Sequence, residues 1–276
     1  MITINRKIVL GVSMLSVLIA GCKKEVGDKG LESPFQSKGN TTVINEVGTI
    51  NGLSYIDLLN DFQKPAEVVV HIQSYNTLGN QMTNGLPSLS IYGGVSLKDN
   101  KHISLNVNGK LWEAKGKSIS YQVEPQYKPL YQPLYGATVK CKLANEIGEL
   151  VDFNAYLPKQ PKITLNGYEP GVGLFHNINS DLNINWERDP TNELGALLIT
   201  LSLPNTNGEE VYILVPDNGS YLISNNVFQK FKGNEYIDIS LSRGAYKRVK
   251  LASPNSGKSL RYYSIVHTHF GVNLEE

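Results

Sequence analysis

The sequence predicts an all-β protein built of two tandem antiparallel β-sandwich domains. Apolar residues recur at every second position over most of the chain, which is the period of a strand with one buried face. Glycine, asparagine and proline separate these segments roughly every ten residues, as they do in sandwiches. The one helical candidate after the N-terminal region is 54–62, which is long enough for one or two turns.

Composition excludes several classes of protein. The chain has 276 residues, enough for one large domain or two of ordinary size. Hydrophobic residues make up 41%, which excludes disorder over most of the length. A single long apolar run excludes a multi-span membrane protein. The 26 Lys and Arg against 25 Asp and Glu leave no basic excess for a nucleic-acid partner, and two cysteines are too few for a disulfide-rich scaffold.

Residues 1–21 have the pattern of a targeting segment. Arg6 and Lys7 give a positive start, and 8–20 are mostly apolar. This run is shorter than the ~20 residues of a membrane-spanning helix and fits the apolar region of a signal peptide. It ends in Ile19-Ala20-Gly21-Cys22, in which small residues precede a cysteine.

These last four residues resemble the lipobox of bacterial lipoproteins, and of Bacteroidota-type outer-membrane lipoproteins in particular. The resemblance implies cleavage before Cys22, lipidation of its sulfur, a membrane anchor and an outer-membrane place in the cell envelope. Two or more acyl chains anchor a protein stably, because each buried methylene contributes ~0.8 kcal/mol. The alternative is a plain secretory signal with a chance cysteine. Cleavage removes Arg6 and Lys7 and no acidic residue, so the mature chain is slightly acidic.

Residues 22–41 are predicted to form a flexible tether, because they are rich in Gly, Ser, Lys and Asn. Glu25 and Asp28 follow the cysteine closely, which is similar to Bacteroidota tethers that favour display on the outer face of the cell. Three lysines among them depart from that pattern.

The first sandwich is predicted at 42–160. Alternating or β-branched segments occur at 67–72, 103–107, 119–123, 137–143 and 151–155. Asn108-Gly109 after the second of these is a strong hairpin signal. Two prolines, Pro158 and Pro161, then interrupt the pattern and place a domain boundary near residue 160.

The second sandwich is predicted at 161–276. Its alternating segments are 182–186, 197–203, 211–215, 221–223, 237–241 and 263–270. Trp186 on an early strand, the strand spacing and the length resemble an immunoglobulin-like or fibronectin-type module without its cysteine pair. The segments 215–221 and 239–244 are similar to modules of Bacteroidota surface lipoproteins. This resemblance concerns architecture and implies no activity.

A tyrosine-rich loop is the first candidate for a binding site. Tyr127, Tyr131 and Tyr135 are spaced by two Pro-Leu-Tyr repeats. Pro129 and Pro133 exclude a central strand, so the segment is predicted to be a loop. Three tyrosines on a stiff loop would offer a platform for sugar rings or a protein partner. Alternatively, the rings pack back onto the sheet.

His267 and His269 are weak metal candidates. Positions i and i+2 of a strand lie on one face, so two imidazoles could share an ion, with His176 or an acidic loop as a third ligand. The alternative is the polar face of a terminal strand, and the expectation is no metal. Cys141 shares a face with apolar neighbours and is predicted to be a small buried side chain.

A loop after Trp186 carries oxygen side chains that could in principle hold calcium. They are Asp181, Asp189, Asn192 and Glu193, whose spacing does not match an EF-hand. Turn and cap chemistry is the preferred interpretation, since Asp-Pro favours turn initiation.

The predicted function is a lipid-anchored cell-envelope protein with a non-enzymatic role in glycan or protein binding, adhesion or assembly. No nucleophile-elbow, zinc-protease or kinase signature occurs, so no catalytic residue and no cofactor are predicted. The alternative is a lipid-anchored polysaccharide hydrolase with a sandwich catalytic domain. That activity would need two carboxylates ~5–10 Å apart beside exposed aromatic rings.

Overall fold

A computed structural model of the chain describes much of the protein after residue 40. The described residues are 41–47, 49–50, 53–54, 68–78, 86–93, 102–107, 110–115, 118–122, 135–145, 148–169, 172–204, 208–250 and 259–276. The predicted signal peptide, Cys22 and the predicted tether up to residue 40 lie outside them, as do Tyr127 and Tyr131. Among the described residues, no helix is long and apolar enough to cross a membrane.

Strands dominate the described part, as predicted. The first ten are β1 (Thr41–Asn45), β2 (Thr49–Ile50), β3 (Leu53–Ser54), β4 (Val68–Thr77), β5 (Leu86–Gly93), β6 (His102–Val107), β7 (Lys110–Lys115), β8 (Ser118–Gln122), β9 (Ala137–Asn145) and β10 (Gly148–Leu157). The rest are β11 (Ile163–Thr164), β12 (Leu174–Asn177), β13 (Leu182–Trp186), β14 (Ala196–Ser202), β15 (Glu210–Pro216), β16 (Ser220–Ile223), β17 (Tyr236–Lys250) and β18 (Ser259–Glu275). A short helical segment, α4 (Asn225–Phe228) and the 3-10 turn η5 (Gln229–Phe231), was not predicted.

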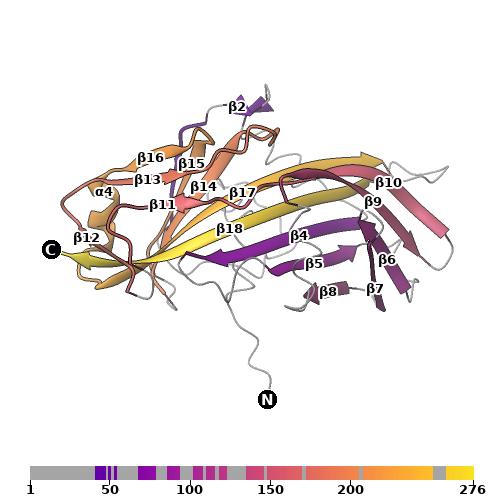
Figure 1. The fold of residues 1–276 in the computed structure, drawn as a ribbon, viewed down its shortest axis with the longest axis horizontal. Helices are drawn as coiled ribbons and strands as arrows, with labels where there is room; N and C mark the ends of the chain where they lie inside the picture. Colours follow the sequence, from indigo (N-terminus) through magenta and orange to yellow (C-terminus); the bar gives the residue numbers. More distant parts are fainter. Residues whose placement is uncertain are drawn as a thin grey trace, which may run out of the picture.

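One large sheet organises the molecule (Figure 1). Its strand order is β1-β15-β14-β17-β18-β4-β5-β8, and β12 also pairs with β18. Strands β17 and β18 are 15 and 17 residues long and form a continuous antiparallel hairpin. At ~3.3 Å per residue this hairpin is ~50 Å long.

Two smaller sheets cover one face of the large sheet. The sheet β11-β13-β16 packs over β15, β14, β17 and the end of β18, around a core that includes Trp186, Phe228 and Phe270. The order of strands in these two layers is that of an immunoglobulin-like sandwich. The sheet β10-β9-β6-β7 packs farther along the hairpin, where Phe153 meets the ring of Tyr262 edge-on at 5.7 Å.

The predicted boundary near residue 160 does not separate two independent sheets. Strand β18 pairs with β4 in parallel over Leu260–His269 and with β12 over Val272–Glu275, so it belongs to both halves. Two tandem, separate sandwiches are therefore not confirmed. The described strands form two sandwich-like layers that share one sheet, because the β17–β18 hairpin is long enough to cross both.

The chain joins the edge of the large sheet at residue 41, the last residue of the predicted tether. Strand β1 pairs in parallel with β15, from Thr41↔Glu210 to Asn45↔Leu214. Just beyond it, the Glu46 carboxylate accepts a hydrogen bond from the Tyr221 hydroxyl at 2.8 Å. Since Tyr221 lies on β16, this contact ties the start of the fold to the opposite layer.

Candidate functional site

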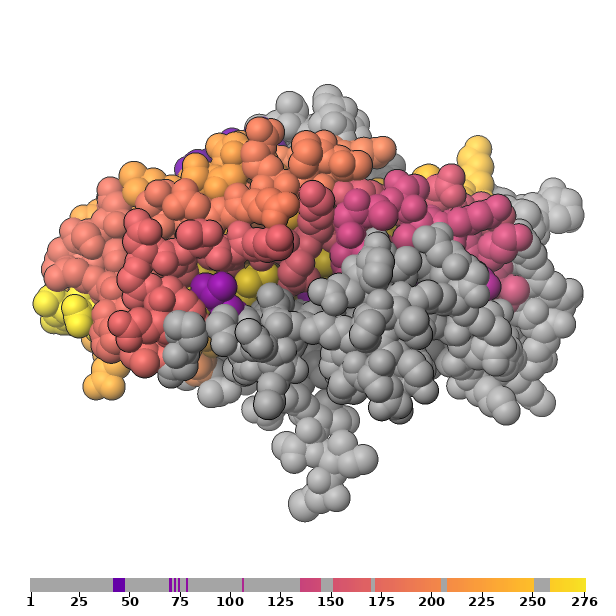
Figure 2. Space-filling model, in the orientation of Figure 1, coloured from indigo at the N-terminus to yellow at the C-terminus, as the bar shows by residue number. Residues whose placement is uncertain are grey.

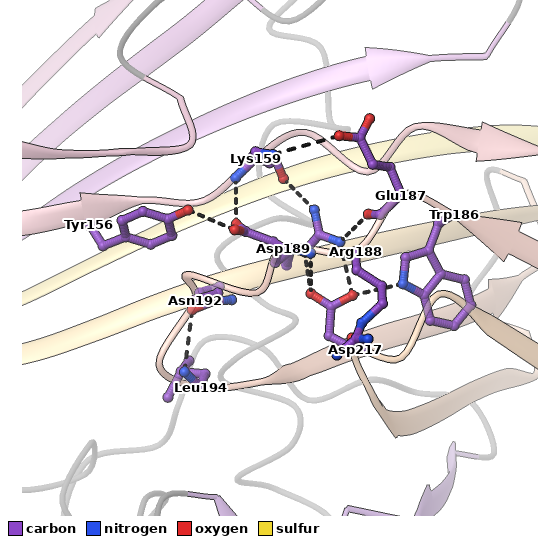
Figure 3. Close-up of polar contacts among 11 residues, drawn as sticks. Tyr156, Lys159, Trp186, Glu187, Arg188, Asp189, Asn192, Leu194 and Asp217 are labelled. Carbon is purple, nitrogen blue, oxygen red and sulfur yellow. Dashed lines mark hydrogen bonds and ion pairs between the residues drawn. The ribbon is translucent and has the colours of Figure 1, made fainter.

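A buried ion pair between Arg243 and Asp217 lies at the centre of a network of polar contacts. Figure 3 shows this network. The Arg243 Nε lies 2.7 Å from the Asp217 Oδ2, and its Nη2 lies 2.9 Å from Oδ1. The two side chains are 0% and 1% exposed. A bidentate pair of this kind is held by geometry as well as charge.

The remaining donors around this pair tie three segments together. Arg243 donates to the carbonyl oxygens of Lys159 and Glu187 at 2.8 and 2.7 Å. The Trp186 indole Nε1 donates to the Asp217 carboxylate at 2.8 Å. The pair therefore fixes the segment between β10 and β11, the end of β13 and the β15–β16 turn on the middle of β17.

A second carboxylate, Asp189, lies beside this ion pair, and both of its oxygens accept hydrogen bonds (Figure 3). It accepts from the Tyr156 hydroxyl at 2.7 Å and from the Lys159 backbone N–H at 2.8 Å. Its own backbone N–H points to Asp217 at 3.4 Å. Burial and the Asp189 contact raise the pKa of the Tyr156 phenol, so this hydroxyl stays a donor.

The two neighbouring carboxylates, Asp189 and Asp217, do not have the features that glycoside hydrolysis needs. Both carboxylates are buried, and the charge of Asp217 is matched by Arg243. A catalytic pair must instead reach a sugar, with one acid protonated and one ionised. The arrangement thus supports a structural role for both groups.

The oxygen side chains around the loop after Trp186 close turns and cap α4, as the preferred interpretation of the sequence has it. Asp189 accepts the backbone N–H of Asn192 through its carbonyl, which closes a turn. The Asn192 side chain donates to the Gly244 carbonyl at 2.9 Å. Asp181 accepts from the backbone N–H of Asn225 at 2.8 Å, at the start of α4.

The two candidate histidines share one face of β18, as the spacing predicts. His267 is 2% exposed, and its Nδ1 lies 2.7 Å from the Ser242 hydroxyl. Burial, with a smaller effect of His269, lowers the pKa of His267 to about 4. Within the described ranges, no group of three His, Cys, Asp or Glu side chains is placed to hold a metal ion. His176 instead points its Nε2 at the Ser180 carbonyl, 3.1 Å away.

The predicted tyrosine platform is only partly described. Tyr135 is half-buried and its hydroxyl is enclosed, and burial raises its pKa although a nearby Ser74 hydroxyl partly offsets this. The platform formed with Tyr127 and Tyr131 stays a prediction. Cys141 is 0% exposed, as expected for a small core side chain.

Sequence reasoning missed Arg243 and Asp217 as a pair. Asp217 lies in the segment 215–221 and Arg243 in the segment 239–244. The available signal was an arginine in the middle of an otherwise apolar and small-residue strand, since such a charge is almost never buried without a partner. The sequence does not indicate which carboxylate pairs with this arginine, because Asp217 and Arg243 are 26 positions apart and come together only in the folded protein.

Comparisons with known proteins add little to this geometry. No protein-family model and no curated protein matches the chain. One similar solved structure comes from a 1.5-MDa bacterial ice-binding adhesin and concerns its retention on the host cell surface. It is 12% identical with a TM-score of 0.21, and the match covers 77% of this chain and 67% of that one. Another is the FN1–FN3 domains of chicken CNTN1, with 12% identity and a TM-score of 0.23; the match covers 64% of this chain and 59% of that one. The fold assignment accordingly rests on the strand order itself.

Proposed function

We propose that the protein is a lipid-anchored component of the bacterial cell envelope with a binding or structural role rather than a catalytic one. The observation that carries this is the lipobox-like Ile19-Ala20-Gly21-Cys22 behind a charged and apolar leader. The fold is consistent with a tethered domain, because β1 pairs with β15 at the edge of the large sheet where the predicted tether ends.

The site geometry supports the non-enzymatic part of the proposal. The carboxylates and the arginine that the fold brings together are buried and hydrogen-bonded to one another. They hold segments in place and are shielded from any substrate. Rigidity of this kind suits a display or assembly role, since a binding surface on a fixed scaffold loses little entropy on contact.

Lipid anchoring is tested by metabolic labelling of the full chain with an alkyne-bearing fatty acid. Wild-type protein should be labelled and should sediment with membranes. Cys22→Ser should lose the label and accumulate with its leader uncleaved. Labelling that persists in Cys22→Ser, or unlabelled wild-type protein, would reject the anchor.

The binding role is tested with the full chain, purified in detergent, on a glycan array. A Tyr131→Ala, Tyr135→Ala double variant reports on the predicted platform. Loss of a glycan signal in the variant assigns that loop to carbohydrate recognition. Absence of any signal favours a protein partner, to be found by crosslinking on intact cells, whereas turnover of a glycan would establish the hydrolase alternative.

A further inference from the structure

Two exposed aromatic side chains lie in one row at the end of the large sheet. Strands β12 and β18 end together at one end of the molecule, and the C-terminal residues of β18 are at the surface there (Figures 1 and 2). The strand register places Phe175 of β12 and Tyr236 of β17 on either side of Asn273 of β18. Phe175 is 57% exposed and Tyr236 is 36% exposed. This row points away from the core, because Leu174 and Val272, the strand neighbours of Phe175 and Asn273, belong to it.

The ring of Tyr236 is held across a glycine of the neighbouring strand. A Cβ added at Gly271 would lie 2.5 and 2.6 Å from the Cζ and Cε2 atoms of Tyr236, so the ring occupies the space above this glycine. The Tyr236 hydroxyl donates to the Asp238 Oδ1 at 3.1 Å. Burial and the Asp238 carboxylate raise the pKa of Tyr236 to about 12, so its hydroxyl remains a donor at neutral pH. The ring is therefore fixed before any ligand arrives, which lowers the entropic cost of binding.

The polar groups in and beside this row suit a ligand with hydroxyl groups. The Asn273 Nδ2 donates to the Val172 carbonyl at 3.2 Å, which fixes the amide between the two rings. Asp238 lies on the same face as Tyr236, opposite Gly271. An amide both donates and accepts hydrogen bonds, as a sugar hydroxyl does, whereas a lysine or arginine side chain only donates them. The mixture of an amide and a carboxylate beside two rings thus favours a sugar over a cationic side chain.

The charges on the two strands of the hairpin at this end discriminate between classes of sugar. Residues 235–238 and 271–276 contain four acidic residues, Glu235, Asp238, Glu275 and Glu276, and no lysine or arginine. Negative charges at the rim of a site repel an anionic ligand and leave a neutral one unaffected. The surface therefore selects against uronic acids and sulfated sugars.

We propose that the row Phe175–Asn273–Tyr236 binds a neutral glycan, with one sugar ring stacked on Tyr236 and the chain extending across Asn273 to Phe175. The apolar face of a sugar ring packs on an aromatic ring while its hydroxyls reach the polar groups beside it. Phe175 and Tyr236 are two strand spacings apart, ~10 Å between Cα atoms, so the ligand has more than one sugar unit. This deepens the binding role proposed above, and rests on it, by naming the ligand class and a surface other than the predicted tyrosine platform.

The test is calorimetric titration of the full chain, purified in a detergent without a sugar head group that would compete for the site. The probes are neutral hexasaccharides of glucose, mannose and N-acetylglucosamine, with hexagalacturonate as the anionic comparison. Wild-type protein should bind at least one neutral hexasaccharide and should not bind hexagalacturonate. Tyr236→Ala and Phe175→Ala should each weaken this binding about tenfold or more, because each removes one stacking ring.

Two pairs of variants provide matched controls. Leu222→Ala removes another exposed apolar side chain, on β16 in the opposite layer, and should bind like wild type. Gly271→Ala keeps both rings but displaces that of Tyr236, so it should weaken binding as Tyr236→Ala does. Gly244→Ala, whose added Cβ has its nearest neighbour 3.6 Å away, should bind like wild type. Circular dichroism confirms that each variant is folded.

Several results would overturn the proposal. They are binding of no neutral hexasaccharide, full affinity in both Tyr236→Ala and Phe175→Ala, or an equal loss in Leu222→Ala. Binding of hexa-arginine in place of a glycan would also overturn it and would assign the row to a cationic protein partner. Glycan binding that is lost only in the Tyr131→Ala, Tyr135→Ala variant would preserve the binding role and overturn this site. None of these results bears on fatty-acid labelling at Cys22, so the proposals fail separately.

Discussion

Arg243 on β17 and Asp217 in the β15–β16 turn face each other inside the protein, with two charge-assisted hydrogen bonds of 2.7 and 2.9 Å. The two residues are 26 positions apart and are both shielded from solvent. Arg243 lies in the middle of β17 and bonds to the carbonyl of Lys159, which lies between β10 of one smaller sheet and β11 of the other. The ion pair therefore links both smaller sheets to β17. Its loss should therefore affect the whole fold and not one loop.

Arg243→Met should lower the free energy of unfolding strongly. The substitution leaves Asp217 buried without its counter-charge, which costs ~3–5 kcal/mol in comparable sites. Urea unfolding followed by Trp fluorescence measures the loss. The control is Lys140→Met, which removes an exposed ion pair to Asp152 at 3.2 Å and should cost under ~1 kcal/mol. Similar losses in the two variants would contradict the assignment of Arg243 as a structural centre.

Gly219→Ala should destabilise the protein, while Gly244→Ala should not. Gly219 has φ of +103° in the turn after Asp217, and an added Cβ would lie 3.2 Å from the Arg188 Cγ. A non-glycine residue in this region costs ~1–2 kcal/mol. Gly244 has no positive φ, and its nearest neighbour to an added Cβ is 3.6 Å away. Thermal unfolding of the two variants compares them directly, and an equal Tm would contradict the argument.

The strand pattern was readable from the sequence because most strands have one buried and one exposed face. The alternation at 137–143 and 151–155 corresponds to β9 and β10, whose register shows Phe153 opposite Cys141. The hairpin signal Asn108-Gly109 lies between β6 and β7, which pair as Val107↔Lys110. Both features depend on residues that are close in the sequence, and the alternation of apolar and polar residues indicates only such local structure.

The shared sheet and the ion pair were not readable in the same way. The pairing of β4 with β18 joins residues nearly 200 positions apart, and nothing local specifies it. Strand β17 is buried on both faces around Ser242 and Arg243, so its polar positions do not mark a solvent face. The boundary near residue 160 followed from two prolines, which mark a turn in the chain and say nothing of the hairpin that crosses beside it.

Cys141 should resist alkylation in the native protein. Burial raises the pKa of its thiol to about 12, with a smaller contribution from Asp152, so the reactive thiolate is scarce at neutral pH. Iodoacetamide followed by mass spectrometry should find no adduct on Cys141 until urea unfolds the chain. If Cys22 is acylated as proposed, native protein from membranes should carry no alkylated cysteine at all. Rapid native modification of Cys141 would show that its strand opens.

The stability of the protein should fall between pH 6.5 and pH 4 because of His267. The pKa of His267 is about 4 in the folded protein and ~6.5 in an unfolded chain, so the unfolded state binds a proton that the folded state excludes. The contribution is fully present above pH 6.5 and is lost as pH falls towards 4, by up to ~3 kcal/mol. His176, whose pKa is also lowered by burial, adds to the same direction.

Urea unfolding at a series of pH values isolates this effect with two variants. His267→Gln should flatten the dependence between pH 6.5 and 4, leaving what His176 contributes. Ser242→Ala removes the hydroxyl 2.7 Å from Nδ1 but keeps the buried imidazole, so it should lower stability while retaining the pH dependence. A wild-type profile as flat as that of His267→Gln would mean that the imidazole titrates freely and is not enclosed. A profile lost in both variants would instead place the origin in their shared contact.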